Sequence, residues 1–538
     1  MGTSSEASYE NHEKDKDEIV AVSTREVDTA AELASGDQGP LDPAESLRVR
    51  RKIDKHILPL MCSPHSGQDS IYGQDDTGKR GNSGHTASHT SYNEPNLTAS
   101  NSKPIRYNWL GTIFYLSYLA FEFPQNLCLQ RFPVGKWMSF NIFVWAVALC
   151  AHAACKNFAG LFVVRLILGM CEGSITAGFM IVSSMFHTRT EQTLRSSADA
   201  SKVLMNGTAQ IISGFISFGS LHIRTKSFEP WQWLMIITGT LTLLTALAFW
   251  FLFPDSPTNA WFLTLPERSI AVRRIKAGRD SENQTGVENK HFKKEQMIEA
   301  FTDPKTWLFA LFSALDNVPN SLTNQRQIIV ASFGFTPFQT TLLGCVDGFI
   351  EIVTIWTGVT IVSRIPNSRA YVGFIYFFPN ILGVFLINFL PWSNKVGLLF
   401  GQWTTGVGTT GFVLSLSWLS SVTAGHTKRV TTNAIMLSAY CIGNAAGPFM
   451  WQAKYKPRNH VPWIIIGVCY VICMGLLLAI RYLLASENKR RDNEPVDTTY
   501  DDVYIEKIGP DGVVEKVKVD KEYLDLTDIQ NREFRYVL

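Results

Sequence analysis

The stretch that decides the fold is Leu161–Phe186, LFVVRLILGMCEGSITAGFMIVSSMF, an apolar run interrupted by Arg165 and Glu172. As an α-helix it is long enough to cross ~30 Å of hydrocarbon. The two charged residues are seven positions apart, so they lie on nearly the same helix face, roughly 10 Å apart along the axis. Because an unpaired charge in hydrocarbon costs at least ~2.5–3.5 kcal/mol, this face is expected to border a protein interior or an aqueous cavity.

Two glycines accompany these charges. Gly169 and Gly173 have the Gly-x-x-x-Gly spacing that lets a neighbouring helix backbone approach closely. We interpret the charged face as a candidate site. A structural ion pair, or an end charge that reaches the membrane surface, is the alternative interpretation.

Apolar runs of about this length recur along the 538 residues and predict an all-α membrane protein that crosses the bilayer many times. Basic residues in alternate loops predict which loops are cytosolic, and they place the basic central segment on that side. The eleven candidate spans lie at about 107–130, 137–155, 158–186, 200–222, 231–253, 306–331, 339–362, 370–391, 396–420, 430–452 and 461–485.

These runs divide the chain into regions. We expect a disordered cytosolic N-terminal tail at 1–55, a degenerate or frame-shifted first-span region at 56–106, and an N-terminal helical bundle at 107–253. A central cytosolic loop at 254–305, a C-terminal helical bundle at 306–485 and a cytosolic C-terminal tail at 486–538 complete the chain.

Several classes of protein are disfavoured by the sequence. The nine cysteines fall mostly within apolar runs, without the paired spacing of a disulfide framework or a metal site. The apolar runs contain no His-x-x-x-His or Cys-x-x-Cys, and no nucleotide-binding loop is visible in the sequence. We therefore expect no catalytic residues, no metal, no cofactor, no nucleic-acid partner and no ATP-driven step.

The motifs around these runs resemble one family. Residues 107–126, YNWLGTIFYLSYLAFEFPQN, followed by 130–137, QRFPVGKW, closely resemble fungal allantoate-permease-like anion:cation symporters of the major facilitator superfamily. The segments that agree further are Pro254-Asp-Ser-Pro, Gly425-His-Thr-Lys-Arg429, Tyr440-Cys-Ile-Gly-Asn-Ala-Ala-Gly-Pro448 and the tail from Leu526 to Val537. The resemblance implies a major facilitator fold, two six-helix bundles in a pseudo-symmetric arrangement.

The resemblance also implies a first helix that the sequence does not show. Related chains carry an acidic and basic pair there, whereas 63–106 is polar. Ile71–His85, IYGQDDTGKRGNSGH, can be back-translated and read one nucleotide later as a sequence of the family's type, which suggests a frame-shifted helix. A natural polar insertion, with a glycosylation sequon at Asn96, is the alternative.

The candidate site lies on polar residues at membrane depth. Carriage of an organic anion with a proton requires a cation and a titratable carboxyl group. Arg165 can grip a carboxylate bidentately, and Glu172 in a low-dielectric cavity is a plausible proton carrier. The resemblance assigns the same roles to this pair. Tyr118 and Glu122, four apart on the preceding span, are expected nearby, with Glu122 as a second titrating group or a structural carboxyl.

The second half contributes weaker candidates. Asn444, between two glycines and Pro448, is expected to face a ligand from a broken helix, and Gln402 is a further substrate contact. The alternative for these polar groups is hydrogen bonding between helices, which applies equally to Thr405, Asn317 and Asn320. The acidic pair Asp347 and Glu351 is interpreted as structural.

Basic loop residues resemble the facilitator signature that latches one closed state. We assign Arg131, Gly135, Lys136 and Arg364 to gating. The chain departs from the family near Ser321, where a glycine is expected, and near Gln325, where an aromatic residue is expected.

The sequence thus predicts a proton-coupled importer of small carboxylates such as allantoate or ureidosuccinate, as a monomer in a lipid bilayer. Placement in the fungal plasma membrane follows from the resemblance alone. A non-transporting nutrient sensor on the same fold, or an inactive product of a faulty gene model, is the alternative.

Overall fold

The structure is a computed structural model. It describes residues 42, 44–57, 102–155, 157–186, 200–223, 225, 228–280, 293–456, 458–495, 504–508, 514–518 and 526–538. Apart from its two edges, the first-span region at 56–106 lies outside the described residues. The hypothesis of a frame-shifted helix at Ile71–His85 and the sequon at Asn96 lie outside them too.

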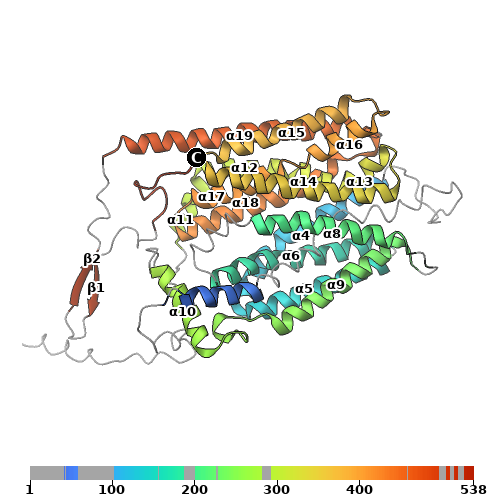
Figure 1. Cartoon of the computed structure of the whole chain (residues 1–538). Helices are drawn as coiled ribbons and strands as arrows, with labels where there is room; N and C mark the ends of the chain where they lie inside the picture. Colours follow the sequence, from blue (N-terminus) through green and yellow to red (C-terminus); the bar gives the residue numbers. More distant parts are fainter. Residues whose placement is uncertain are drawn as a thin grey trace, which may run out of the picture.

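Long helices build an N-terminal bundle, drawn in cyan and green in Figure 1. These helices are α4 (Ser102–Arg131), α5 (Val134–Ala154), α6 (Phe158–Phe186), α8 (Ala200–Ser220) and α9 (Pro230–Leu252). The central segment that follows contains η1 (Pro257–Asn259), α10 (Leu265–Asp280) and α11 (Lys294–Thr302).

The C-terminal bundle contains interrupted helices. Its elements are α12 (Pro304–Asn317), η3 (Pro319–Ser321), α13 (Leu322–Ser332), α14 (Pro337–Arg364), α15 (Arg369–Phe389), α16 (Lys395–Thr404), α17 (Thr409–Ser421), α18 (His426–Ala446), η4 (Gly447–Met450), η5 (Ala453–Tyr455) and α19 (His460–Asp492). The predicted break near Pro448 is confirmed, because α18 ends at Ala446 and η4 continues the chain. Proline lacks the N–H that a regular helix requires.

Two features follow the last long helix. Strands β1 (Tyr504–Ile508) and β2 (Val514–Lys518) pair antiparallel, with Tyr504 opposite Lys518. The C-terminal segment 526–538 then returns to the bundle (Figure 1). We call the end of the bundle that carries α10, α11 and this segment the tail end, and the opposite end the far end.

Six of the described helices are individually long and apolar enough to cross a membrane: Val134–Ala154, Phe158–Ile175, Pro230–Leu252, Pro337–Arg364, Arg369–Phe389 and His460–Asp492. The outward surface of the bundle agrees with this, since large apolar side chains such as Phe123, Phe251 and Phe389 are more than two thirds exposed. Such a surface suits lipid rather than water. The protein is therefore a multi-pass membrane protein.

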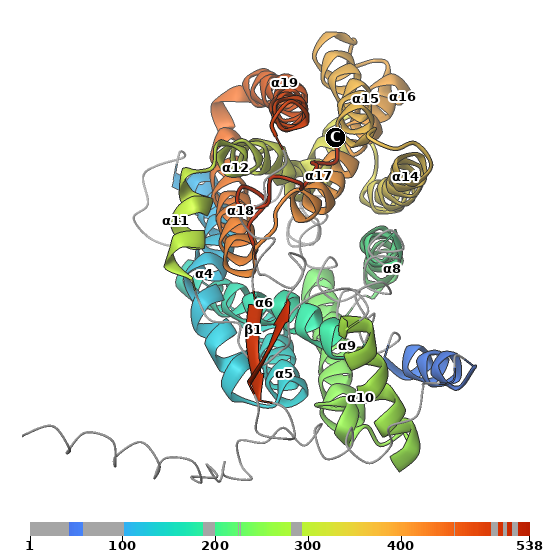
Figure 2. The same ribbon diagram turned by 90° about the vertical axis from the view of Figure 1, so that its left-hand side faces the viewer.

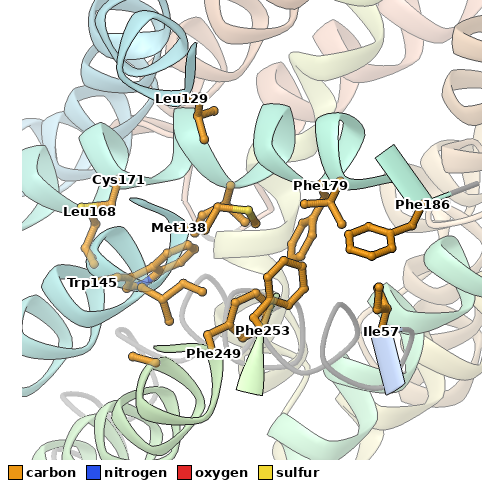
Figure 3. Packing of buried hydrophobic residues seen from close by; sticks show 14 of the residues in the cluster. Ile57, Leu129, Met138, Trp145, Leu168, Cys171, Phe179, Phe186, Phe249 and Phe253 are labelled. Carbon is orange, nitrogen blue, oxygen red and sulfur yellow. The ribbon is translucent and has the colours of Figure 1, made fainter. Parts of the chain in front are cut away.

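The bundles have separate apolar cores. Seen from the tail end in Figure 2, α4, α5, α6 and α9 form one group, and α12 and α14 to α19 form the other. Each group buries its own cluster of hydrophobic residues. Figure 3 shows the first cluster, in which Phe249, Phe253 and Phe179 lie between α9 and α6. Burial of one such side chain contributes about 1.5–3 kcal/mol.

One expectation about the N-terminal tail is corrected. Residues 44–57 form a helix, although we predicted a disordered tail as far as residue 55. Val49, Ile53 and Ile57 are spaced four apart and therefore lie on one face. All three are buried in the first apolar cluster, where Ile57 lies near Phe186 and Phe253 (Figure 3).

The glycines of α6 perform the predicted role. A Cβ atom added to Gly169 would lie 2.1 Å from the Phe114 carbonyl oxygen, and one added to Gly173 would lie 3.2 Å from the Glu122 Cα. Neither position leaves room for a side chain without movement of α4. The spacing therefore brings α4 and α6 together along their length.

The two bundles meet along two helix pairs. Between α8 and α14, a Cβ on Gly207 would lie 2.5 Å from the Gly348 carbonyl oxygen. Between α4 and α18, the Thr112 hydroxyl donates to the Ala445 carbonyl oxygen at 2.9 Å. These contacts frame the space between the bundles.

The C-terminal segment covers the tail end of the second bundle. Asp528 is fully buried beside Lys428 and Lys305, which lie in the first turns of α18 and α12. Trp418 Nε1 donates to the Val537 carbonyl oxygen at 2.7 Å, and Arg491 Nη1 donates to that of Phe534 at 2.8 Å. The segment thus ties together the tail-end termini of several helices.

Candidate functional site

A cavity of about 410 Å³ lies where the two bundles meet. Such a volume is within the range of pockets for small ligands. Its first wall comes from α4, α6 and α8, and its second wall comes from η3, α13, α14, α17, α18 and η4. The charged and amide side chains that line it are Glu172, Gln210, Asn320, Asn324, Arg326, Gln327, Asp347, Glu351 and Asn444.

Three of the predicted site residues line this cavity: Tyr118 on α4, Glu172 on α6 and Asn444 on α18. Tyr118 and Glu172 share a wall because the Gly169 and Gly173 contacts hold α4 against α6. This wall presents a phenol beside a carboxyl group.

The other predicted contacts are not among the described residues that line the cavity. Arg165 is buried on α6, two turns closer to the far end than Glu172. Glu122 lies beside Gly173 at the α4 and α6 contact and is half-buried. Gln402 is fully buried in α16, and neither atom of its amide has a hydrogen-bond partner among the described residues.

Asn444 is the centre of a hydrogen-bonded amide cluster. Its Nδ2 donates to Asn317 Oδ1 at 3.1 Å and to the Tyr440 carbonyl oxygen at 3.0 Å. Its Oδ1 accepts from Asn320 Nδ2 at 2.7 Å. Because both ends of the amide are engaged, Asn444 joins α18 to α12 and η3 as well as lining the cavity.

The sequence reasoning missed Arg326, a cation of the cavity. Arg326 belongs to α13, and its Nη1 lies 3.4 Å from Asp347 Oδ2 on α14. Asp347 is 6% exposed. An arginine inside the apolar run at 306–331 was the available signal, since a charge at membrane depth is itself a site candidate.

The pair is incompletely hydrogen-bonded. Arg326 Nε and Asp347 Oδ1 are buried and have no hydrogen-bond partner within the described part of the chain. Buried polar atoms are normally hydrogen-bonded, so these two atoms are exceptions that require an explanation. We had interpreted Asp347 as structural, yet it lines the cavity.

A second acidic contact joins the two bundles. Gln210 Nε2 on α8 donates to Glu351 Oε2 on α14 at 2.7 Å. Glu351 also lines the cavity, one turn beyond Asp347. The acidic pair predicted as structural therefore serves different contacts: Asp347 faces an arginine, and Glu351 crosses the interface.

One of the two departures from the family, Ser321, makes a specific contact. Ser321 Oγ accepts from Trp451 Nε1 at 3.0 Å, which joins η3 to the residue after η4. Gly447 faces the same side chain, because a Cβ added there would lie 2.9 Å from Ser321 Cβ.

The gating candidates lie at the tail end. Lys136 N donates to Asp255 Oδ1 at 3.2 Å, and Lys136 Nζ donates to the Trp250 carbonyl oxygen. A Cβ on Gly135 would lie 2.7 Å from that Asp255 oxygen. Arg131 and Arg364 are exposed at the ends of α4 and α14.

The cavity is more acidic than basic. Glu172, Asp347 and Glu351 face a single described arginine, Arg326. Within the described ranges, no group of three or more His, Cys, Asp or Glu side chains could hold a metal ion. The arrangement can hold a carboxylate on the guanidinium and protons on the acidic groups.

Comparisons with known proteins place these features in context. Residues 90–448 match the family model described as Major Facilitator Superfamily. The chain is 32% identical over 496 residues to the thiamine pathway transporter of Saccharomyces cerevisiae, covering 91% of this chain and 86% of that protein. It is 29% identical over 536 residues to the allantoate permease of the same yeast, covering 97% and 92%.

A solved structure is similar in fold. The xylose transporter XylE from E. coli, in a partially occluded inward-open conformation, superposes with a TM-score of 0.57 at 11% identity. The similarity covers 81% of this chain and 98% of that one. At this low sequence identity, the structural similarity supports a shared fold and nothing more specific. The sequence-based assignment to the facilitator fold, and the resemblance to fungal relatives that include an allantoate permease, are confirmed.

Proposed function

Because this chain belongs to the major facilitator superfamily and is a transporter rather than an enzyme, we propose that it couples uptake of a small organic carboxylate to a proton. We place it in the plasma membrane with the tail end in the cytosol, where the basic loops belong. The two bundles then alternate access to the cavity between them.

The observation that carries this proposal is the arginine in the central cavity. Arg326 is the described cation among the lining residues, and a guanidinium can bind a carboxylate through two parallel hydrogen bonds. A neutral sugar-like ligand needs no such cation. Arg165, buried toward the far end of α6, is proposed as a second cation on the path to the cavity.

The acidic side chains supply the reason for proton coupling. A carboxylate that enters beside Glu172, Asp347 and Glu351 meets like charges in a low-dielectric space. Protonation of at least one of these groups removes that repulsion, so anion binding and proton binding favour each other. Glu172 is proposed as a proton carrier from this wall, with Glu122 behind it at the α4 contact.

The size of the cavity limits the substrate. A volume of about 410 Å³ suits molecules of the size of allantoate or ureidosuccinate. Amide groups of Asn320 and Asn324 line the same space and can pair with ureido groups. We therefore propose a nitrogen-containing carboxylate.

The test is uptake of labelled allantoate by cells that express the chain, with and without a protonophore that collapses the pH gradient. A second version of the chain, with the shifted frame in 63–106 restored, is measured beside it. Accumulation that the protonophore abolishes supports the proposal. Accumulation in the restored version alone also supports the frame-shift hypothesis.

Other outcomes contradict specific parts of the proposal. Uptake that is insensitive to the protonophore would exclude proton coupling. A panel of further carboxylates follows if allantoate fails. Binding of a carboxylate without any uptake would favour the nutrient sensor, and neither binding nor uptake in both versions would reject the function.

A further inference from the structure

We propose that Asp347 and Arg326 form an exchangeable pair, in which ionised Asp347 occupies the guanidinium and protonated Asp347 releases it to the substrate carboxylate. This inference rests on the proposed function and deepens it. It assigns substrate binding to α13, proton coupling to α14, and the link between them to one ion pair.

The geometry of the pair leaves hydrogen-bonding capacity unused. The Arg326 and Asp347 side chains are 16% and 5% exposed, and their nearest charged atoms are 3.4 Å apart. In the described part of the chain, Arg326 Nε and Asp347 Oδ1 lack hydrogen-bond partners. A permanent structural pair would be expected to use these atoms in a bidentate contact. The loose contact fits a pair that opens.

The space around the guanidinium suits a second carboxylate. Gly406, between α16 and α17, faces Arg326, since a Cβ added there would lie 3.5 Å from Nη2. Gly344 lies one turn before Asp347, and a Cβ added there would be 4.0 Å from the nearest described atom, on Gln327. Both glycines line the cavity. The side of the pair that faces the cavity is therefore uncrowded.

The charged groups around Asp347 favour Arg326 as its partner. On its own helix, Glu351 is held by Gln210 of α8. Across the cavity, the titratable groups are Glu172, Tyr115 and Tyr118 of the first wall and Tyr440 of α18.

The other helices packed on α14 present uncharged side chains. Tyr376 of α15 hydrogen-bonds the Thr357 hydroxyl at 2.7 Å, and Trp403 of α16 donates to the Leu343 carbonyl oxygen at 3.3 Å. α17 presents Thr409 to the same cavity. Arg326 is the cation that faces Asp347 among the described residues. Protonation of Asp347 therefore removes the negative charge that pairs with the Arg326 guanidinium.

The exchange gives an ordered cycle. A proton binds Asp347, the guanidinium becomes free, and the substrate carboxylate binds it. After the bundles reorient, loss of the substrate lets Asp347 release its proton and pair again with Arg326. One proton accompanies one carboxylate, so the site carries the same charge loaded and empty. A partly loaded site would bury an uncompensated charge, which is costly.

The experiment uses the purified full chain in liposomes and separates two readouts. One is accumulation of the labelled carboxylate driven by a pH gradient, and the other is exchange of labelled for unlabelled carboxylate without a gradient. We expect Asp347→Asn to reduce accumulation about tenfold or more while exchange persists and becomes independent of pH. Arg326→Gln is expected to abolish both readouts.

Two further variants separate coupling from structure. The control is Asp492→Asn at the end of α19, an exposed aspartate that pairs with Arg535 at the tail end, and it should retain accumulation. The charge-swapped double variant, Arg326→Asp with Asp347→Arg, restores an ion pair but exchanges the two roles. It should remain inactive if the pair couples transport, whereas recovered accumulation would show that the pair is merely structural.

The failures are distinguishable. If the wild-type chain accumulates a carboxylate and Asp347→Asn accumulates it equally well, this inference fails and the proposed function stands. If the wild-type chain neither transports nor binds any carboxylate, as judged by thermal shift, both fail.

Discussion

Asp528 Oδ1 lies 3.0 Å from Lys428 Nζ, and both side chains are completely buried, although 100 residues separate them in the chain. Lys428 also contacts Asp303 and Glu299, each at 2.8 Å, and Asp528 also pairs with Lys305. The C-terminal segment thereby adds a third carboxylate to a cluster that also contains two lysines, Asp303 and Glu299.

Removal of the Asp528 charge should destabilise the protein strongly. Asp528→Asn removes the carboxylate that contacts both Lys428 and Lys305, while Asp303 still contacts each lysine, so the cost is at most the about 3–5 kcal/mol of a broken buried pair. The measurement is thermal unfolding of the purified protein in detergent. Arg535→Gln is the matched control, because its pair with Asp492 is exposed at the same end and should contribute about 0–1 kcal/mol. Equal effects would contradict a special role for the buried pair.

The same cluster should make stability fall in acid. Burial disfavours the Asp528 carboxylate, but the charges of Lys305 and Lys428 outweigh burial and hold the pKa of Asp528 below its usual value. A lowered pKa contributes stability that is present above the unfolded pKa of about 3.9 and is lost as pH falls through the folded value. The stability difference between wild type and Asp528→Asn should therefore be constant above about pH 5 and shrink below pH 4. A difference that widens in acid would reverse the assigned sign.

The α4 and α6 contact should not tolerate a methyl group. Gly169→Ala places a Cβ 2.1 Å from the Phe114 carbonyl oxygen, so the helices must separate at a cost of about 1–3 kcal/mol. Gly475→Ala on α19 is the control, because no described atom lies within 4 Å of its added Cβ. Unfolding temperatures of the two variants test this, and a Gly169→Ala protein as stable as the control would refute the close approach.

The fold was more predictable from the sequence than the site. Apolar runs and the Gly169 and Gly173 spacing report local geometry, so they led to the spans and to the α4 and α6 contact. The Arg326 and Asp347 pair depends on how α13 and α14 pack, and the pattern of one helix carries no information about its neighbour. Asp347 was therefore interpreted as structural, and Asn444 was expected to face ligand without the amide cluster that engages it.

The contact between Gly135 and Asp255 should affect transport rate more than substrate affinity. Gly135→Ala displaces the Asp255 carboxylate that accepts from Lys136 N at the tail end, far from the cavity. If this contact latches one closed state, its loss shifts the balance of states and slows uptake. We expect uptake to fall about tenfold with little change in the binding of carboxylate. An unchanged uptake rate in a folded variant would exclude the gating role.

Substitution of Asn444 tests whether its amide has a structural role or contacts the ligand. Asn444→Ala leaves the amides of Asn317 and Asn320 without their partner, which costs about 1–3 kcal/mol for buried polar groups. We expect a lower unfolding temperature with the rank order of transported carboxylates unchanged, because the Asn444 amide is engaged by protein groups. The matched variant Asn324→Ala removes a cavity-lining amide from α13 instead. It should alter substrate preference with little loss of stability, and the reverse pattern would make Asn444 the ligand contact.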